Sequence, residues 1–212
     1  MGAVSIEFSS VGVSPVQISA AVQIQIKELS GGFLSSLGPR PLGLIFEHAA
    51  LSRFGILVVA VDSEDGTVVG YVLGATNTGS FYKDFLRHHW AVALRHFVPR
   101  LISVERMRKA VETLLYPLRG GKAAHGAPPA AELLDLAVTR EMHGSGVAQG
   151  LFMAFVAECR LVGVEELNIP TTAGLDRAHR FYEKMGAVRE SRVEVHKGED
   201  AFVYRYSLTR SA

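Results

Sequence analysis

The sequence has very little cysteine and no excess of charge of either sign, and both absences exclude classes of protein. Cys159 is the only cysteine among 212 residues, so no internal disulfide can form, which suits a reducing compartment. Because it stands in the middle of an expected helix, far from the N-terminal end that would lower its pKa, we expect a structural thiol and not a nucleophile. The net charge is +1 and no block of like charge occurs, so we expect no nucleic-acid partner.

Long hydrophobic runs are also missing. The longest apolar run, residues 56–61, is far too short to cross a bilayer. The amino terminus has no basic region followed by a sustained apolar stretch, and Ile6 stands where a myristoylation motif has Ser or Thr. These features predict a soluble, cytoplasmic protein without a membrane partner.

Apolar residues are nevertheless abundant. They make up 48% of the chain, enough for one sizeable core without disulfide or metal, and we expect residues 1–212 to form a single domain. The mean hydropathy of +0.20 indicates that some apolar surface is covered by a partner. The simplest such partner is a second copy, so we expect a possible homodimer.

Strand-like and helix-like patterns alternate along the chain without an internal repeat. Period-two alternation and β-branched runs predict strands at 4–8, 56–62, 67–75, 132–139, 166–170, 188–195 and 202–208. Helical patterns cover 16–29, 41–52, 81–97 and 104–116, with one more helix after the fourth strand and one after the fifth. Residues 79–129 therefore form a helical insertion between the third and fourth strands.

The most informative stretch is LLDLAVTREMHGSGVAQGLF, residues 133–152, in which an apolar strand runs into a glycine turn that opens a helix. Gly144 and Gly146 allow a tight turn, and the first amides of a helix lack intrahelical acceptors. Together with the helix dipole, these amides favour a phosphate or diphosphate ligand. The expected amide donors belong to Gly144, Ser145, Gly146, Val147, Ala148 and Gln149.

Two common phosphate-binding motifs do not match this turn. A P-loop requires Gly-Lys-Ser/Thr, but Val147 and Ala148 follow Gly146, so no lysine or magnesium-binding hydroxyl is present. A dinucleotide fingerprint requires a third glycine or alanine where Gln149 stands. The sequence therefore does not predict a nucleotide triphosphatase or a dinucleotide-binding domain.

The turn instead resembles the acyl-CoA-binding motif of the GNAT superfamily of N-acyltransferases, which reads Arg/Gln-x-x-Gly-x-Gly/Ala after an apolar triplet. His143, Gly146 and Ala148 occupy the three fixed positions. Residues 178–187, AHRFYEKMGA, resemble the second signature of the family, a helix with a tyrosine and a terminal glycine. About eighty residues, 132–208, follow the order of the family. The apolar triplet would be Leu136, Ala137 and Val138.

The resemblance implies a fold, a donor and a catalytic acid. The fold would be α/β: a mixed, mostly antiparallel seven-stranded GNAT sheet flanked by helices, with the insertion between strands 3 and 4. Acetyl-CoA would be the cosubstrate, an amine the acceptor, and no metal would be needed. Tyr182 matches the tyrosine of the family, and a phenol with an ordinary pKa near 10 keeps a proton that a leaving thiolate can take.

The fourth strand offers two candidates for the general base, Glu132 and Asp135. Glu132 aligns with the base of the histone acetyltransferase branch, whereas Asp135 resembles an aspartate of some aminoglycoside acetyltransferases. Strand alternation predicts that the two lie on opposite faces, so that at most one faces the acceptor. A water chain is a third possibility. A backbone amide in or near residues 136–138 would stabilise the oxyanion.

The chain departs from the family pattern in three places. His143 replaces Arg or Gln, and Leu175 replaces an asparagine that contacts the pantetheine, where we expect Thr171, Thr172 or the backbone near Gly174 to substitute. The insertion is the third departure. Its basic and aromatic residues form either a wall that recognises an anionic acceptor or a solvated helical face with Phe81, Phe85 and Leu94 packed inward. These residues are His88, His89, Trp90, Arg95, His96, Arg100, Arg106 and Arg108.

Two further questions concern histidines. His89 and His96 are two helical turns apart, roughly 10 Å, which is too far for them to bind one metal ion. His179 lies one turn before Tyr182 and either packs in the core or lines the acyl pocket.

The sequence thus predicts an acetyl-CoA-dependent N-acetyltransferase that acts on a small-molecule amine, such as an amino sugar or amino acid. The alternatives are a non-catalytic acyl-CoA sensor or scaffold, transfer of a longer acyl group, and acetylation of a protein amine. The family shares its donor site and varies its acceptor site, so the acceptor itself does not follow from these residues.

Overall fold

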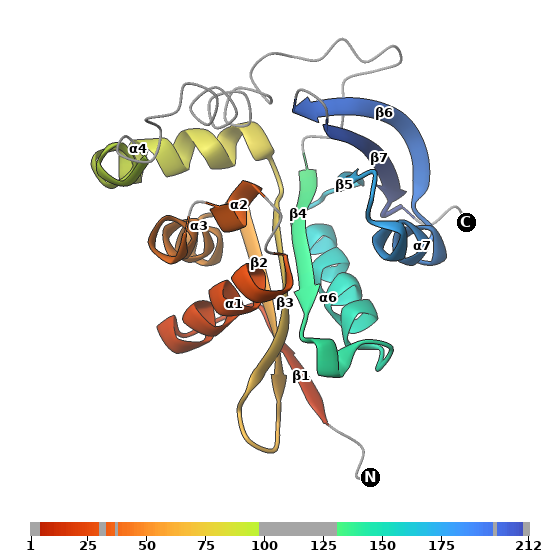
Figure 1. Cartoon of the computed structure of the whole chain (residues 1–212), viewed down its shortest axis with the longest axis horizontal. Helices are drawn as coiled ribbons and strands as arrows, with labels where there is room; N and C mark the ends of the chain where they lie inside the picture. The colour runs from red at the N-terminus through yellow and green to blue at the C-terminus, as the bar shows by residue number, and fades with distance from the viewer. Residues whose placement is uncertain (1–4, 30–32, 37, 98–130, 197–198, 210–212) are drawn as a thin grey trace.

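The computed structural model describes residues 5–29, 33–36, 38–97, 131–196 and 199–209, and its centre is a seven-stranded sheet (Figure 1). The strand order is β1-β2-β3-β4-β5-β7-β6. All neighbours pair antiparallel except β4 and β5. The sequence prediction of a mixed, mostly antiparallel sheet is confirmed. The strands are β1 Ile6–Ser9, β2 Gly55–Asp62, β3 Val68–Ala75, β4 Ala131–Val138, β5 Glu166–Thr172, β6 Val188–His196 and β7 Glu199–Ser207.

Helices cover both faces of this sheet. On the left in Figure 1 lie α1 Pro15–Glu28, α2 Phe33–Ser36, α3 Pro39–Leu51 and α4 Thr78–Phe97, and on the right lie α6 Val147–Leu161 and α7 Asp176–Lys184. The short 3-10 helix η2 Arg140–Met142 leads from β4 toward α6. Each face has its own buried cluster, one around α6 and one around α1 and α3. Burial of these apolar side chains on both faces is the main force that holds the layers together.

Local signals in the sequence explain where several elements begin. Ser14 caps α1 through a hydrogen bond from the Gln17 amide, and the Gln17 side chain accepts from the Ser14 amide at 2.8 Å, which completes a capping box. Pro15 then occupies the first helical position, where its missing NH costs nothing. Gly66 adopts φ +75° in the turn between β2 and β3, a backbone conformation that favours glycine.

The α6 core depends on a close approach between a helix and the sheet. Phe155 is fully buried, and a Cβ added to Gly74 of β3 would lie 2.3 Å from its ring. A glycine is therefore required for this ring to reach the sheet. Cys159 is also fully buried on α6, and burial raises the pKa of its thiol to about 12. This environment supports the expectation of a structural thiol, because a thiol with a raised pKa is a weak nucleophile.

The element boundaries differ from the sequence predictions by a few residues at most, with three exceptions. The short 3-10 helix η2 was not predicted. The four-residue α2 was not predicted, since its Phe-Leu-Ser-Ser sequence is too short for a periodic pattern. The helix predicted at 104–116 lies outside the described residues. Within the described part of the chain, none of the helices combines the length and apolar character needed to cross a bilayer.

Candidate functional site

A gap opens in the middle of the sheet, where the one parallel pair among the described strands separates. β4 and β5 pair at two positions, Ala131 with Leu167 and Glu132 with Asn168, and form no other pair along their described lengths. From Leu133 onward the edge of β4 that faces β5 is therefore free of strand partners. The triplet Leu136, Ala137 and Val138 lies in this part of β4, where it pairs with β3 on one side and leaves the backbone groups of its other edge without a strand partner.

The glycine turn predicted to bind a diphosphate stands at the end of β4 that leads into this gap. Gly144 and Gly146 adopt φ +80° and +94°, a conformation that favours glycine. No side chain caps α6, and its first helical hydrogen bond runs from the Gly150 amide to the Gly146 carbonyl at 3.0 Å. The amides of Ala148 and Gln149 in the first turn thus have no helical acceptor, and the Val147 amide has only a 3.4 Å contact to the Ser145 hydroxyl.

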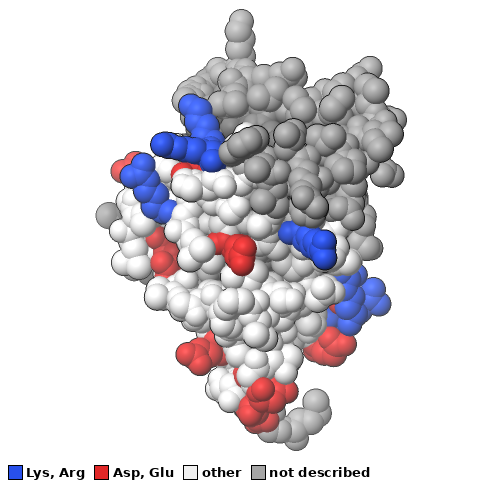
Figure 2. Space-filling model, turned by 90° about the vertical axis from the view of Figure 1, so that its left-hand side faces the viewer, with Lys and Arg blue, Asp and Glu red and all other residues white. Residues whose placement is uncertain are grey.

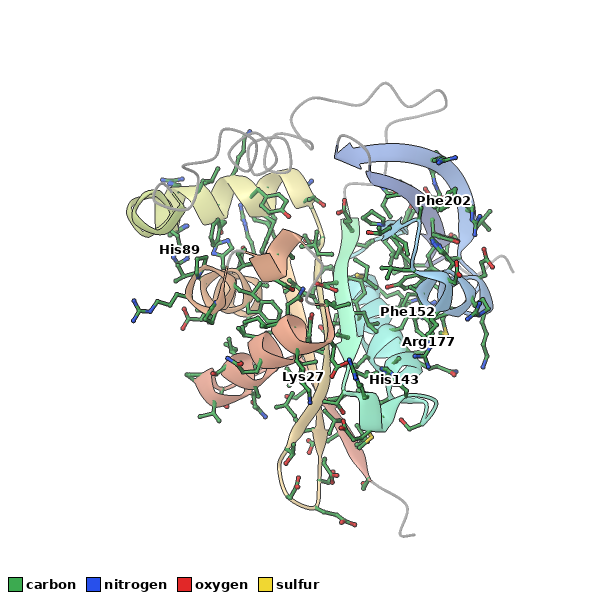
Figure 3. All side chains as sticks on the ribbon, viewed as in Figure 1. Lys27, His89, His143, Phe152, Arg177 and Phe202 are labelled. Atoms are coloured by element: carbon green, nitrogen blue, oxygen red, sulfur yellow. The ribbon has the colours of Figure 1, made fainter. Side chains whose placement is uncertain are left out.

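Two basic side chains meet beside this turn. The Arg177 Nη1 atom of α7 lies 3.5 Å from the His143 Nδ1 atom, and Figure 3 shows both residues near the start of α6. Arg140, in contrast, is paired with Glu28 of α1 at 3.3 Å. Because Arg177 is a permanent cation next to open backbone amides, this surface favours an anionic ligand.

The two candidate bases lie on the same face of β4, so the prediction of opposite faces is wrong. The register between β3 and β4 shifts, since Leu73 pairs with Asp135 but Gly74 pairs with Leu133. Leu134 is the extra residue of a β-bulge, and a bulge advances the alternation of side chains by one. Accordingly, Leu133 and Leu136, three residues apart, both contact the α6 core.

Glu132 lies under the beginning of the inserted helix α4. Burial raises the pKa of the Glu132 carboxyl to about 7. The pKa of Tyr82 on α4 is raised mainly by burial and, to a smaller extent, by the charge of Glu132. A carboxyl with a pKa near neutrality can take up a proton during a reaction at physiological pH.

Asp135 lies three residues after Glu132 on β4, where its neighbours are Gln25 of α1 and Tyr71 of β3. Burial raises the pKa of its carboxyl to about 6, while hydrogen bonds with Gln25, the Leu136 backbone and Tyr71 act in the opposite direction. Its charge also raises the pKa of Tyr182. Asp135 is therefore electrostatically coupled to the predicted catalytic acid, and Glu132 is not among the groups that shift Tyr182.

Tyr182 of α7 lies in the buried core on the α6 side of the sheet. It is 7% exposed, and its ring packs near Phe152 and Tyr204 in the α6 core. Burial, followed by the charge of Asp135, raises the pKa of its hydroxyl well above the ordinary range. The phenol is thus firmly protonated at neutral pH.

The residues near the start of α7 bear on two of the sequence predictions. Leu175 is 46% exposed at the N-cap of α7, whereas Thr171 of β5 is 4% exposed and its hydroxyl has no hydrogen-bond partner among the described residues. His179 is buried. Its Nε2 donates to the carbonyls of Thr172 and Ala173 at 3.1 and 3.2 Å, and its Nδ1 lies 2.9 Å from the Tyr204 hydroxyl. With both ring nitrogens engaged, His179 fastens α7 to β5 and β7, which supports the packing alternative.

In the inserted helix, the described part packs inward as one of the two alternatives predicts. Phe81 and Phe85 of α4 are 0% and 3% exposed. Asp84 accepts a hydrogen bond from Ser52 at 3.0 Å and lies 3.4 Å from His48 of α3. The His48 ring packs against that of His89, whose position on α4 is labelled in Figure 3. The structure does not describe the remaining side chains of the predicted basic wall or that of Leu94. These wall residues are Trp90, Arg95, His96, Arg100, Arg106 and Arg108. Among those described, no three His, Cys, Asp or Glu side chains gather as metal ligands.

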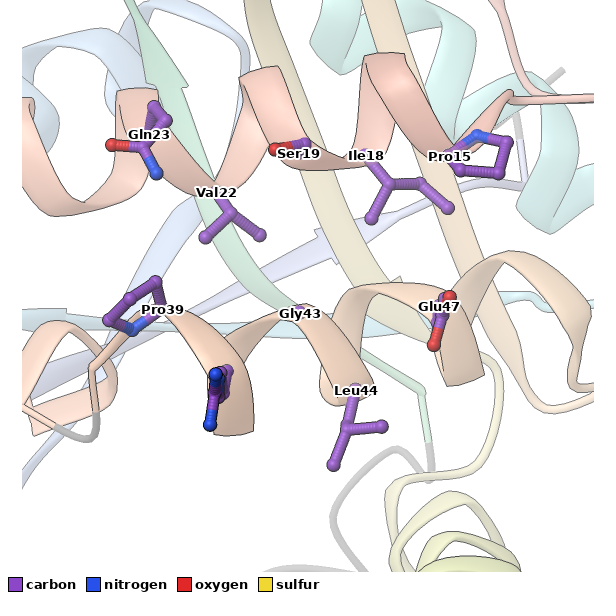
Figure 4. Close-up of a pocket in the computed structure, with 10 residues that line it drawn as sticks. Pro15, Ile18, Ser19, Val22, Gln23, Pro39, Gly43, Leu44 and Glu47 are labelled. Atoms are coloured by element: carbon purple, nitrogen blue, oxygen red, sulfur yellow. The ribbon is translucent and has the colours of Figure 1, made fainter. Parts of the chain in front are cut away.

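A separate groove of about 400 Å³ lies between α1 and α3 and contains none of the predicted site residues (Figure 4). Its lining is mostly uncharged, apart from Arg40 and Glu47 of α3. The same side of the molecule shows a broad area without Lys, Arg, Asp or Glu (Figure 2). This groove is a candidate surface for another chain and not part of the gap.

Comparison with known proteins identifies the family. The model of the Acetyltransferase (GNAT) family matches residues 25–187, which include the gap, the glycine turn and Tyr182. The chain belongs to the GNAT family of acetyltransferases. Members of this family transfer acyl groups from acetyl-CoA to amines. No curated protein matches the chain in sequence.

Solved structures share this fold at low sequence identity. The crystal structure of SsHAT matches with a TM-score of 0.66 at 20% identity, covering 97% of this chain and 100% of that one. A putative GNAT acetyltransferase from Desulfovibrio desulfuricans matches with a TM-score of 0.61 at 17% identity, covering 97% and 100%. Arabidopsis thaliana NAA60, solved in complex with acetyl-CoA, matches with a TM-score of 0.57 at 14% identity, covering 96% and 98%. These likenesses establish the GNAT fold.

Sequence reasoning missed two polar residues of the site, Gln25 and Tyr71. Gln25 interrupts the apolar stripe of α1, being seven positions after Ile18 and three after Val22. A glutamine in that stripe is a signal for a buried polar contact. Tyr71 sits in an apolar strand where a core tyrosine is ordinary, so its sequence gave no comparable signal.

Proposed function

We propose that this protein is an N-acetyltransferase that moves an acetyl group directly from acetyl-CoA to the amine of a small molecule. The observation that carries the proposal is the gap between β4 and β5, which leads to the glycine turn at the start of α6. The half-buried Asp135 carboxyl raises the pKa of the buried Tyr182 phenol, so the two groups are within electrostatic reach of each other. Acyl transfer to an amine requires a group that takes a proton and a group that supplies one.

The donor would lie along the gap with its diphosphate on the glycine turn. The amides of Ala148 and Gln149 in the first turn of α6 offer backbone donors and the positive end of a helix dipole, whereas the Ser145 amide already donates to the Met142 carbonyl at 3.2 Å. His143 and Arg177 add side-chain donors to this end, which compensates for the missing family arginine. Leu136, Ala137 and Val138 pair with β3 on one side, and the opposite edge of their backbone would hold the pantetheine arm and supply the amide donor for the oxyanion.

Asp135 is the favoured base, with Glu132 as the alternative. The carboxylate would take one proton from the acceptor ammonium group, and the neutral nitrogen would then attack the thioester carbonyl. As the C–N bond forms and the C–S bond breaks, Tyr182 would protonate the leaving sulfur. The second proton of the ammonium group would return to the Tyr182 phenolate, so one proton leaves through Asp135 for each acetyl group transferred.

The electrostatics suggest an order for these proton transfers. An ionised Asp135 is one of the causes that raise the pKa of Tyr182. Once Asp135 has accepted a proton it is neutral, and Tyr182 becomes a better acid. The same carboxyl therefore deprotonates the amine and then prepares the phenol to protonate the sulfur.

The acceptor is the least constrained part of the proposal. Glu132 and Tyr82 place polar groups from β4 and α4 together, and the cover that α4 provides favours a small amine. A protein amine is the alternative, because structures with this fold include the ribosomal-protein-S18-alanine N-acetyltransferase from Escherichia coli.

Release of free thiol from acetyl-CoA tests the proposal directly. A panel of amino sugars, amino acids, polyamines and peptides with free N-termini should yield at least one amine that consumes the thioester, with the acetylated product found by mass spectrometry. CoA binding without thiol release by any amine would support a sensor instead. Faster turnover with longer acyl-CoA donors or with acyl carrier protein would replace the acetyl assignment.

We also propose that a second copy of the chain docks on the groove between α1 and α3. Arg40 and Glu47 lie seven residues apart on α3, so a two-fold axis across this helix would bring Arg40 of each copy toward Glu47 of the other. Light scattering should give twice the chain mass, and Arg40→Glu should shift the mass toward the monomer. A monomeric wild-type protein at micromolar concentration would overturn the proposal.

A further inference from the structure

A buried amide and a buried phenol meet beneath the Asp135 carboxyl. Gln25 of α1 is 1% exposed, and its Oε1 accepts a hydrogen bond from the hydroxyl of Tyr71 of β3. Its Nε2 donates to the Ser35 hydroxyl at 3.3 Å, which in turn donates to the Leu29 carbonyl at 2.7 Å. These contacts fix which end of the Gln25 amide faces Tyr71.

Tyr71 is held just as firmly. It is fully buried, and its ring meets Phe46 of α3 edge to face with centroids 5.0 Å apart. The ring has no room to swing away, so only the hydroxyl proton can change direction. Tyr71 pairs with Ala137, which lies two residues from Asp135 on the same face of β4, and hydrogen bonding from Gln25 and Tyr71 lowers the pKa of the Asp135 carboxyl.

The number of protons in this network links its geometry to the charge of Asp135. The Tyr71 hydroxyl carries one proton. When it donates that proton to Gln25, its oxygen can only accept, so its bond with Asp135 requires a protonated carboxyl. When Asp135 is ionised, the Tyr71 proton turns to the carboxylate and the Gln25 carbonyl loses its donor.

We propose that Gln25 and Tyr71 are positioning residues, which orient the Asp135 carboxyl toward the gap and set the pH at which it accepts a proton from the acceptor amine. The role in proton uptake rests on the proposed acetyltransferase function, whereas the control of Asp135 titration does not. Hydrogen bonds to a carboxylate are stronger than those to the neutral acid, so the network favours the ionised form against the effect of burial.

Few other titratable groups face Asp135. Tyr71 comes from β3 and Tyr182 from α7, while α1 contributes the uncharged Gln25. Glu132 lies on the same strand. Both tyrosines have raised pKa values and stay protonated, so titration near pH 6 to 7 comes from the two carboxyls of β4.

The test measures the Asp135 carboxyl directly by carbon-13 NMR on full-length protein labelled at aspartate side-chain carboxyl carbons, with Asp135→Asn to assign its signal. Its midpoint in the wild type should lie near pH 6. Tyr71→Phe keeps the ring and removes the hydroxyl, and should raise the midpoint by about one to two pH units. Gln25→Met keeps the chain length, removes the amide and should also raise it.

Tyr82→Phe is the matched control, because it removes a buried hydroxyl beside Glu132 and should leave the Asp135 midpoint unchanged. An unchanged midpoint in both folded Tyr71→Phe and Gln25→Met overturns the inference, whatever their activity. The pH at which kcat falls should move with the NMR midpoint. If the midpoint moves and kcat does not follow, proton uptake by Asp135 is overturned. If neither the wild type nor any variant shows activity, the proposed function is contradicted and the control of Asp135 titration is not.

Discussion

The pH dependence of kcat distinguishes the two carboxyls that the structure places on one face of β4. A general base works only when ionised, so the rate falls as the pH drops through its pKa. Burial raises the pKa of Asp135 to about 6 and that of Glu132 to about 7. The two candidates therefore predict acid limbs at different positions.

The size of the fall follows from these values. Between pH 8 and pH 5, the ionised fraction of a group with a pKa of 6 drops about tenfold, and that of a group with a pKa of 7 drops about ninetyfold. We expect the tenfold fall, because Asp135 is the carboxyl coupled to Tyr182. Initial rates of thiol release at saturating acetyl-CoA and amine measure kcat across this range.

Variants complete this experiment. Asp135→Asn should lower kcat by about a hundredfold or more at pH 8 and remove the limb near pH 6. Glu132→Gln should retain that limb. Glu64→Gln, an exposed carboxyl in the turn between β2 and β3, is the control and should match the wild type. A limb that persists in both Asp135→Asn and Glu132→Gln would refute the reasoning and indicate water as the base.

Four further changes test the acid, the anion site, the core and the buried charge. Tyr182→Phe should lower kcat by roughly ten- to ten-thousand-fold with CoA affinity nearly unchanged by calorimetry; equal turnover would remove Tyr182 from the mechanism. Gly146→Ala strains a left-handed residue by about 1–2 kcal/mol and should weaken CoA binding, whereas Gly163→Ala, with similar φ at the far end of α6, should lose stability alone. Phe155→Ala should lower the free energy of unfolding by about 3–5 kcal/mol in urea, and a loss under 1 kcal/mol would contradict the tight packing at Gly74. Folding raises the pKa of Asp135 to about 6, so the free energy of unfolding of the wild type falls as the pH rises from the ordinary pKa of an aspartate toward pH 6. Asp135→Asn lacks this group, so its free energy of unfolding relative to the wild type should increase by about 2 kcal/mol between pH 4 and pH 8. Equal pH dependence of the two proteins would show that burial of this charge costs little.

Local sequence determined the elements and the donor end of the site. A capping serine and proline begin α1, Asp-Gly closes the β2–β3 turn, and Gly144 and Gly146 open α6, as their residue types require. Each of these signals acts within a few residues, because it depends on backbone conformation and on hydrogen bonds close in the chain. The family motif was readable for the same reason.

Tertiary structure alone decided how the candidate catalytic groups meet. The bulge at Leu134, which brings Glu132 and Asp135 to one face, depends on the register between β3 and β4, and the chain between those strands is long. Gln25 and Tyr71 are 46 positions apart and touch only because α1 packs across β3. Register and layer packing are set by the burial of whole apolar faces, so no short segment contains the information that fixes them.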